Sequence, residues 1–377
     1  MKKQLCFILA FCLTISFSGC LQADENPTQT SDNTTNTQQS TTEPTTEQQF
    51  RETMVAVSVP TITENTTDDD GTVLFQYTYQ HMSLVLHKPA VADKIILEFL
   101  NRVDSTRRSA EDTANMAKNA YNGDKNWVPY LYHLTYSPMR IDHNVLSLFG
   151  NNVVFSGAGH PERTCISASY DLLTGDVLTL ASIMAKDATL DDFSQLVLDG
   201  LAEMAEGDYL YENYANTVKN RFNVDASSDE AWYFTQTGLC FYFSPYEIAP
   251  YSSGVISVEI PYEKLQGLLH EDYFPSARGT AKGTVTVSAF DRVNLSDFSH
   301  IAEIITTKDS DMYMVQTDGS VQDVKIVLSD KTSNYTIFAA YNLSKGEGIM
   351  IQADKDLMQN MKLTYKSNGE TISIPLI

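Results

Sequence analysis

The fold class follows from one run of residues, Leu74-Phe75-Gln76-Tyr77-Thr78-Tyr79, which alternates its side chains in the manner of a β-strand. A helical pattern begins soon afterwards at Pro89, because proline suits the first turn of a helix and apolar residues recur on one face from Val91 to Val103. Strand patterns return at 127–141 and 145–155, with a hairpin turn expected at 150–152. Strands and helices in this order predict an α+β fold.

The mixture of strands and helices continues beyond residue 157. We expect, in chain order, a strand at 165–172, a turn at 173–176, a short strand at 177–180, helices at 187–206 and 208–222, strands at 232–234, 239–243 and 254–260, and a short helix at 261–269. From 284 to 374, short strand runs recur about every ten residues between Asp-Gly, Ser-Asn and Asn-Gly turns, a pattern typical of a small all-β sandwich. The sequence therefore predicts mixed strand/helix domains at 53–156 and 157–275, followed by a β-sandwich domain at 280–377.

The start of the chain has the features of an export signal. Lys2 and Lys3 precede a short apolar run that ends in Ser18-Gly19-Cys20 and is too short to span a bilayer. A cysteine directly after small residues resembles the bacterial lipoprotein signal, in which the cysteine receives a diacylglycerol and the peptide before it is removed. The resemblance implies a signal peptide at 1–19, a lipidated Cys20 and a location on the extracytoplasmic face of the cell membrane. An ordinary cleaved signal is the alternative.

Within the segment at 20–52, the stretch from 22 to about 49 is composed of Thr, Asn, Gln, Ser, Asp, Glu and Pro with hardly an apolar side chain. Such a composition buries too little surface to offset the entropy of ordering the chain. We therefore expect the lipidated cysteine to be followed by a disordered tether.

The chain is strongly acidic. Its formal net charge is −22, and removal of the leader, which carries Lys2 and Lys3 and no acidic residue, makes it about −24. A surface of this charge repels nucleic acid and favours cationic partners, although solubility alone also explains it. We expect no nucleic-acid partner.

Cysteine usage leaves one question open. Cys6 and Cys12 lie in the leader, so Cys165 and Cys240 are the cysteines left for the folded part. In an oxidising compartment this pair can form a disulfide, or each can be a separately buried thiol. The sequence contains no metal-binding spacing of cysteine or histidine, and we expect neither a metal nor a cofactor.

Two motifs in the middle of the chain resemble a known domain. The first is Gly159-His160-Pro161 followed by 169–180, with the letters SYDLLTGDVLTL, and the second is 238–254, with the letters GLCFYFSPYEIAPYSSG, ending in 260–265. Together they resemble the extracellular domain of unknown function found in lysozyme-sensing anti-sigma factors and peptidoglycan deacetylases of bacilli. The resemblance covers about 157–269. It implies a role in binding or sensing at the cell wall, with lysozyme or another cationic protein as partner.

The loop at 244–254 supplies the candidate binding residues. Tyr246 and Tyr251 offer amphipathic contact area, and Glu247 offers a charge for a basic partner. His160 is a fourth candidate, since a histidine in a glycine-rich loop can contact a ligand. Each of these residues also has a structural interpretation, because Pro245 and Pro250 can fix the loop as a clasp.

The sequence favours a binding protein over an enzyme. It has no Gly-x-Ser-x-Gly elbow and no phosphate-binding glycine loop, and the histidine and aspartate runs of the deacetylase catalytic domain are missing. We expect a lipid-anchored, non-enzymatic envelope protein. A peptidoglycan- or glycan-binding module, or an accessory to a wall hydrolase or deacetylase, are the alternatives.

Overall fold

The structure, a computed structural model, describes residues 54–157, 159–204, 209–223, 231–306, 310–329 and 334–377. It has an α+β fold, which confirms the fold class predicted from the sequence. The predicted signal peptide, Cys20 and the tether lie outside the described residues and stay predictions.

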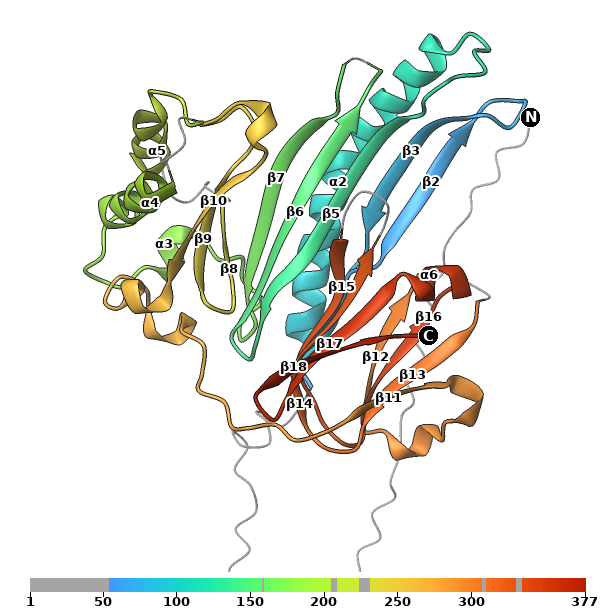
Figure 1. Ribbon diagram of the computed structural model, residues 1–377, viewed down its shortest axis with the longest axis vertical. Helices are drawn as coiled ribbons and strands as arrows, with labels where there is room; N and C mark the ends of the chain where they lie inside the picture. The colour runs from blue at the N-terminus through green and yellow to red at the C-terminus, as the bar shows by residue number, and fades with distance from the viewer. Residues whose placement is uncertain (1–53, 158, 205–208, 224–230, 307–309, 330–333) are drawn as a thin grey trace, which may run out of the picture. The chain divides into compact units, whose positions relative to one another are not determined.

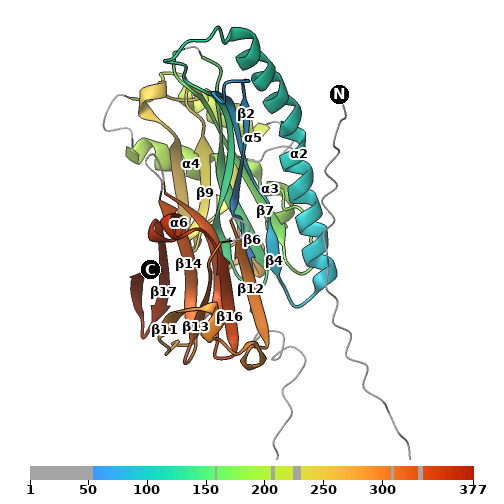
Figure 2. The same ribbon diagram turned by 90° about the vertical axis from the view of Figure 1, so that its right-hand side faces the viewer.

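A five-stranded sheet with one long helix forms the first part (Figure 1). Its strand order is β2 (Thr61–Thr67), β3 (Val73–Gln80), β5 (Tyr130–Ile141), β6 (Val145–Phe155) and β7 (Glu162–Asp171). Strands β3 and β5 are parallel, and the other neighbours are antiparallel. Helix α2 (Pro89–Ala120) runs along one face of this sheet (Figure 2), where Ile95, Phe99 and Val103 are buried against Tyr132, Leu134 and Tyr136.

The predicted turn at 150–152 is wrong, because Gly150 lies inside β6. The β5–β6 turn is at 142–144 instead, where the Asp142 carboxylate accepts hydrogen bonds from the backbone N–H groups of Asn144 and Val145, both at 2.8 Å. Gly150 is required for another reason. A Cβ at this position would lie 2.0 Å from the Thr135 carbonyl oxygen on the neighbouring strand, so only glycine fits.

The central region contains a three-stranded sheet with the order β10 (Ile256–Pro261), β9 (Gly238–Phe243) and β8 (Trp232–Phe234). Helices α3 (Leu180–Ile183), α4 (Leu190–Met204) and α5 (Tyr214–Asn223) accompany this sheet, and the apolar face of α4 packs on Phe241 through Phe193. The expected strand at 177–180 is a single bridge from Val177 to Tyr170. The expected helix at 261–269 is a 3-10 turn, Tyr262–Leu265.

The C-terminal region is a sandwich of two sheets (Figure 1). One has the order β18 (Glu370–Pro375), β17 (Met361–Ser367), β14 (Val321–Ser329), β15 (Asn334–Leu343), β1 (Ala56–Ser58) and β4 (Ser83–Val85). The other has the order β11 (Val285–Ala289), β13 (Met312–Thr317), β16 (Glu347–Gln352) and β12 (His300–Ile305), and the short helix α6 (Lys355–Gln359) follows β16.

Two strands of the sandwich come from the start of the folded chain. Ala56 pairs with Ala340 of β15 and with Val85 of β4, and Met54 and Ala56 are fully buried in the sandwich core. The predicted domain boundaries stay predictions, but strand pairing joins the 53–156 segment to the 280–377 segment. The first strand of the folded chain is therefore part of the C-terminal sandwich.

A buried arginine joins the five-stranded sheet to the central region. Arg140 on β5 is 1% exposed and pairs with Asp142 at 2.6 Å. Its Nη1 donates to the Tyr262 hydroxyl and to the Tyr273 carbonyl oxygen, both at 2.6 Å. A buried charge requires a partner of opposite charge, which Asp142 supplies, and the two hydrogen bonds of Nη1 hold 262–273 against β5.

Candidate functional site

The candidate loop, residues 244–254, begins where β9 ends. Its middle is anchored by Ile248 and Ala249, which are 0% and 2% exposed. The Tyr246 N–H donates to the Ala249 carbonyl at 3.1 Å, and the Tyr211 N–H donates to the Ile248 carbonyl at 2.8 Å. The loop is thus held from inside by two apolar side chains, which leaves neighbouring side chains directed outward.

Tyr246 is the large exposed side chain of this loop. Its side chain is 57% exposed, and its backbone has a φ of 73°, in the left-handed region that bulky residues rarely adopt. Sequence reasoning selected this residue without any signal for its conformation. A strained backbone that presents an aromatic ring to solvent is a feature often found at binding sites.

His160 lies beside this loop although 86 positions separate it from Tyr246. Its ring stacks on Tyr251, with centroids 4.1 Å apart and planes inclined by 26°. The Tyr246 hydroxyl lies 3.3 Å from His160 Nε2, and the Tyr251 hydroxyl donates to the Pro161 carbonyl at 2.8 Å. We call His160, Tyr246 and Tyr251 the aromatic cluster.

Both ring nitrogens of His160 have a polar neighbour in the cluster. Nδ1 is 3.2 Å from the Pro161 carbonyl oxygen, and Nε2 is 3.3 Å from the Tyr246 hydroxyl. The direction of these contacts depends on the tautomer of the ring. The three rings therefore form a hydrogen-bonded platform whose outer part, Tyr246, is open to solvent.

Glu247 does not belong to the aromatic cluster. Its carboxylate forms an ion pair with Arg221 of α5 and accepts a hydrogen bond from the Ser244 N–H at 2.9 Å. Arg221 also donates to the Tyr242 carbonyl at 2.7 Å and lies over the Phe243 ring at 4.3 Å. Because its charge is neutralised within the protein, Glu247 stabilises the loop. No local sequence pattern indicates this pair with Arg221.

Cys165 and Cys240 are free, buried thiols of one small cluster that also contains Tyr233 and Tyr242. This arrangement corresponds to the second of the two alternatives left open by the sequence. Burial raises the pKa of the Cys165 thiol and raises that of Cys240 to about 11. Both thiols are therefore protonated and unreactive near neutral pH.

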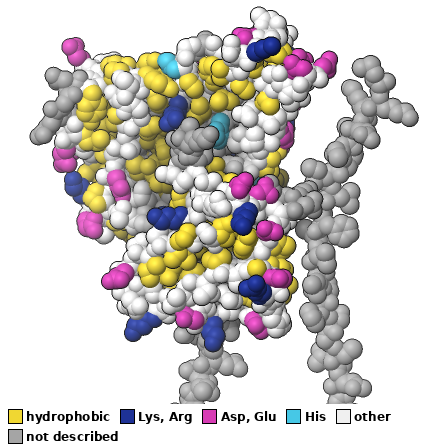
Figure 3. All heavy atoms as spheres, turned by 45° about the vertical axis from the view of Figure 1, so that its right-hand side comes forward, with side chains coloured by type: hydrophobic (Ala, Val, Ile, Leu, Met, Phe, Trp, Pro, Cys, Tyr) yellow, Lys and Arg dark blue, Asp and Glu magenta, His cyan; other side chains and the backbone are white. Residues whose placement is uncertain are grey.

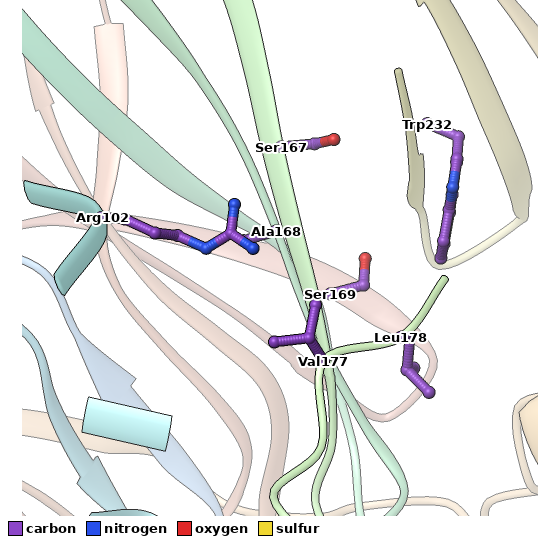
Figure 4. A pocket seen from close by; sticks show the side chains of 7 residues that line it. All are labelled: Arg102, Ser167, Ala168, Ser169, Val177, Leu178 and Trp232. Carbon is purple, nitrogen blue, oxygen red and sulfur yellow. The ribbon is translucent and has the colours of Figure 1, made fainter. Parts of the chain in front are cut away.

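A small cavity lies at β7, between α2 and β8 (Figure 4). Arg102 extends toward the strand from one side, and Ser167 and Ser169 point to the other side, where Trp232 lies. The cavity measures about 10 Å³, the space of a single water molecule. It is too small to be a ligand site, and Arg102 is held by Glu98 at 2.5 Å.

The described residues contain no group of three or more His, Cys, Asp or Glu side chains arranged to hold a metal ion. Within the same residues, no helix combines the length and apolar character needed to cross a membrane. The side chains of the aromatic cluster have the chemistry for ring stacking, hydrogen bonding and attraction of cations to the tyrosine faces.

Comparison with known proteins places a domain of unknown function in the centre of the chain. Residues 182–263 match the family model "Protein of unknown function (DUF3298)", within the predicted 157–275 domain. A crystal structure of a DUF3298 family member from Bacteroides fragilis NCTC 9343 has a TM-score of 0.45 and 15% identity, covering 59% of this chain and 96% of its own. A DUF3298 family protein from Pseudomonas aeruginosa PAO1 has a TM-score of 0.40 and 16% identity, covering 59% and 97%. No curated protein matches the sequence.

Proposed function

We propose that this chain is a lipid-anchored, non-enzymatic binding protein of the cell envelope, and that it recognises a cationic wall-active protein such as lysozyme. The observation that carries the proposal is the aromatic cluster, in which three residues selected from the sequence meet on an exposed surface. Exposed tyrosine faces attract the Lys and Arg side chains of a basic partner. The proposed location rests on the Ser18-Gly19-Cys20 motif.

The negative charge of the chain favours a cationic partner mainly because it raises the association rate, and less because of direct contacts. Net charge near −24 steers a basic protein toward this one and accelerates encounter, an effect that salt screens. On the face shown in Figure 3 the charged side chains carry both signs and are spread out, so this face has no continuous acidic surface. Short-range contacts at the aromatic cluster then supply the specificity.

Capture of lysozyme by the immobilised protein tests the proposal. We expect binding at about 20 mM salt that weakens strongly by about 300 mM, because the Debye length falls from about 20 Å to under 10 Å. Replacing Tyr246 and Tyr251 together by Ala is expected to lower affinity at least about tenfold. The matched control is Tyr313→Ala in the sandwich, which should bind as the wild type does. Equal binding by the double variant removes the aromatic cluster from the proposal.

Wall glycan is the competing ligand, since tyrosine rings also stack on sugars. Sedimentation with purified peptidoglycan, without lysozyme binding, would favour this alternative. Release of soluble fragments from peptidoglycan would favour the hydrolase or deacetylase accessory. The anchor is tested separately by Cys20→Ala, which should move the protein from the membrane to the medium or block its maturation. Unchanged membrane retention contradicts the anchor.

A further inference from the structure

A second hollow lies far along the chain from the aromatic cluster, at the junction of three segments. It measures about 230 Å³ and is lined by His143 of the β5–β6 turn, by residues 276–279 and by the ends of β14 and β15. A smaller hollow of about 160 Å³ adjoins it across Gly279 and Gln322, where Gln322 Nε2 donates to the Gly279 carbonyl at 2.9 Å. Sites that enclose a whole ligand usually measure about 300–1,000 Å³, so this hollow has the size for a chain end or a small group.

Arg278 is the charged side chain on its wall. Its guanidinium lies 3.6 Å from the centroid of Tyr341, whose ring is also packed edge-on by His143 at 4.6 Å. Nη1 donates to Asp323 at 2.6 Å and to the Tyr341 carbonyl at 3.4 Å. Within the described part of the chain, Nε and Nη2 have no partner. These two atoms are the fork that binds a carboxylate with two parallel hydrogen bonds.

The local charge is positive in a chain whose net charge is −22. Asp323 is shared by Arg278 and by Lys366, whose Nζ lies 2.9 Å from its second oxygen. Lys325 is near enough to interact with both Asp323 and Lys366. One carboxylate therefore balances several cations, and an incoming anion meets a favourable potential here.

Asn342 supplies a complementary polar group. Its Oδ1 is buried and has no hydrogen-bond partner among the described residues, although Asn342 lines the hollow. A buried acceptor without a donor costs free energy, which a ligand N–H recovers once the Asn342 side chain turns its Oδ1 toward the hollow. The site thus combines donors for an anion with an acceptor for an N–H group.

We propose that this hollow binds the C-terminal carboxylate of a peptide. The carboxylate lies on Nε and Nη2 of Arg278, and the last amide N–H donates to Asn342 Oδ1. A peptide terminus is the chemistry that joins a planar anion to an adjacent N–H. The stacked and ion-paired Arg278 is already ordered, so little entropy is lost when the ligand binds. This inference does not depend on the aromatic cluster.

Calorimetric titration of the full mature chain with N-acetyl-Ala-Ala tests the proposal, with N-acetyl-Ala-Ala-amide as the uncharged comparison. We expect the carboxylate to bind at least about tenfold more tightly than the amide, since charge-assisted bidentate pairs are the strong ones. Arg278→Lys keeps the charge and removes the fork, and should lower affinity about tenfold in a variant that still unfolds in one cooperative thermal transition. Asn342→Asp places a second anion in the hollow and should abolish binding.

The matched control is Arg292→Lys, at an exposed arginine that lines neither hollow, and it should bind as the wild type does. Equal affinity for the acid and the amide would overturn the proposal, as would full affinity in Arg278→Lys. Inorganic phosphate that binds while the peptide does not would overturn the assignment to a carboxylate. None of these outcomes depends on lysozyme binding.

Discussion

At Tyr246 the loop adopts a conformation that its residue type disfavours. The left-handed backbone costs a non-glycine residue roughly 1–2 kcal/mol, and the buried Ile248 and Ala249 next to it hold the loop in place. The ion pair between Glu247 and Arg221 adds a second restraint. The backbone strain at Tyr246 is thus offset by the burial of Ile248 and Ala249 and by the ion pair of Glu247.

Two substitutions of Tyr246 distinguish the effect of its backbone conformation on stability from the effect of its ring on binding. Tyr246→Gly and Tyr246→Ala both remove the ring, but glycine accepts a positive φ without a steric penalty. We expect the glycine variant to be more stable than the alanine variant, with a free energy of unfolding about 1 kcal/mol higher when measured by urea denaturation. Affinity for the partner should fall equally in both. An alanine variant as stable as the glycine variant would contradict the left-handed conformation in solution.

Asp323 makes the free energy of unfolding depend on pH in the acidic range. Burial alone would raise the pKa of this carboxyl, but the hydrogen bond from Lys366 and the charge of Arg278 outweigh it and lower the pKa below 3.8. Because the folded-state pKa is below the unfolded value, the stabilisation is fully present above about pH 4 and is lost as the pH falls through the folded pKa.

Asp323→Asn tests this dependence and keeps the backbone, since Asn also tolerates the φ of 49° found here. We expect the variant to lose about 2 kcal/mol of unfolding free energy at pH 7, the contribution of hydrogen bonds between charged groups. The difference from the wild type should shrink below about pH 4. A difference that is independent of pH would exclude the ionised carboxylate as its source.

At the scale of elements, local patterns predicted the sandwich strands and the long helix well. Strands β11 to β18 and helix α2 coincide with runs of period two and with a helical face, respectively. Gly150-Asn151-Asn152 has the composition of a turn but lies inside β6, because the Asp142 side chain forms the turn earlier. Composition cannot distinguish a glycine needed for a turn from one needed for close strand contact.

The strand position of Gly150 predicts a large effect of a small substitution. In Gly150→Ala the new methyl group would lie 2.0 Å from the Thr135 carbonyl oxygen, so β5 and β6 must separate locally. We expect a loss of about 1–3 kcal/mol in unfolding free energy, the usual effect of overpacking. Gly279→Ala is the control, because nothing lies within 4 Å of its Cβ. Equal stability of the two variants would disprove the contact.

Over the whole molecule, the sequence could not predict long-range pairing. Strand β1 has three residues and pairs with Phe338 to Ala340 at the other end of the chain, a contact that no local period reveals. The same limit applies to the candidate site. Tyr246, Tyr251 and His160 were selected from their residue types and loops, but their meeting depends on the packing of β7 beside the central sheet.

A charge in β1 tests this long-range closure. Ala56→Asp would place a carboxylate in the sandwich core, where Ala56 is 0% exposed. We expect a loss of at least about 3 kcal/mol, because a buried charge without a partner is strongly disfavoured. Thr63→Asp on the exposed face of β2 should leave the melting temperature nearly unchanged. A mild effect of Ala56→Asp would mean that β1 is not an integral strand of the sandwich.

The position of β1 between two neighbouring strands has a mechanical consequence. A pull applied to the chain before Met54 acts first on a strand that is hydrogen-bonded to β15 on one side and to β4 on the other. Extraction of this strand must break both ladders together and expose Met54 and Ala56 to water. A protein tethered through its N-terminal segment would thus transmit load directly into this six-stranded sheet, where the ladders on both sides of β1 resist the force together.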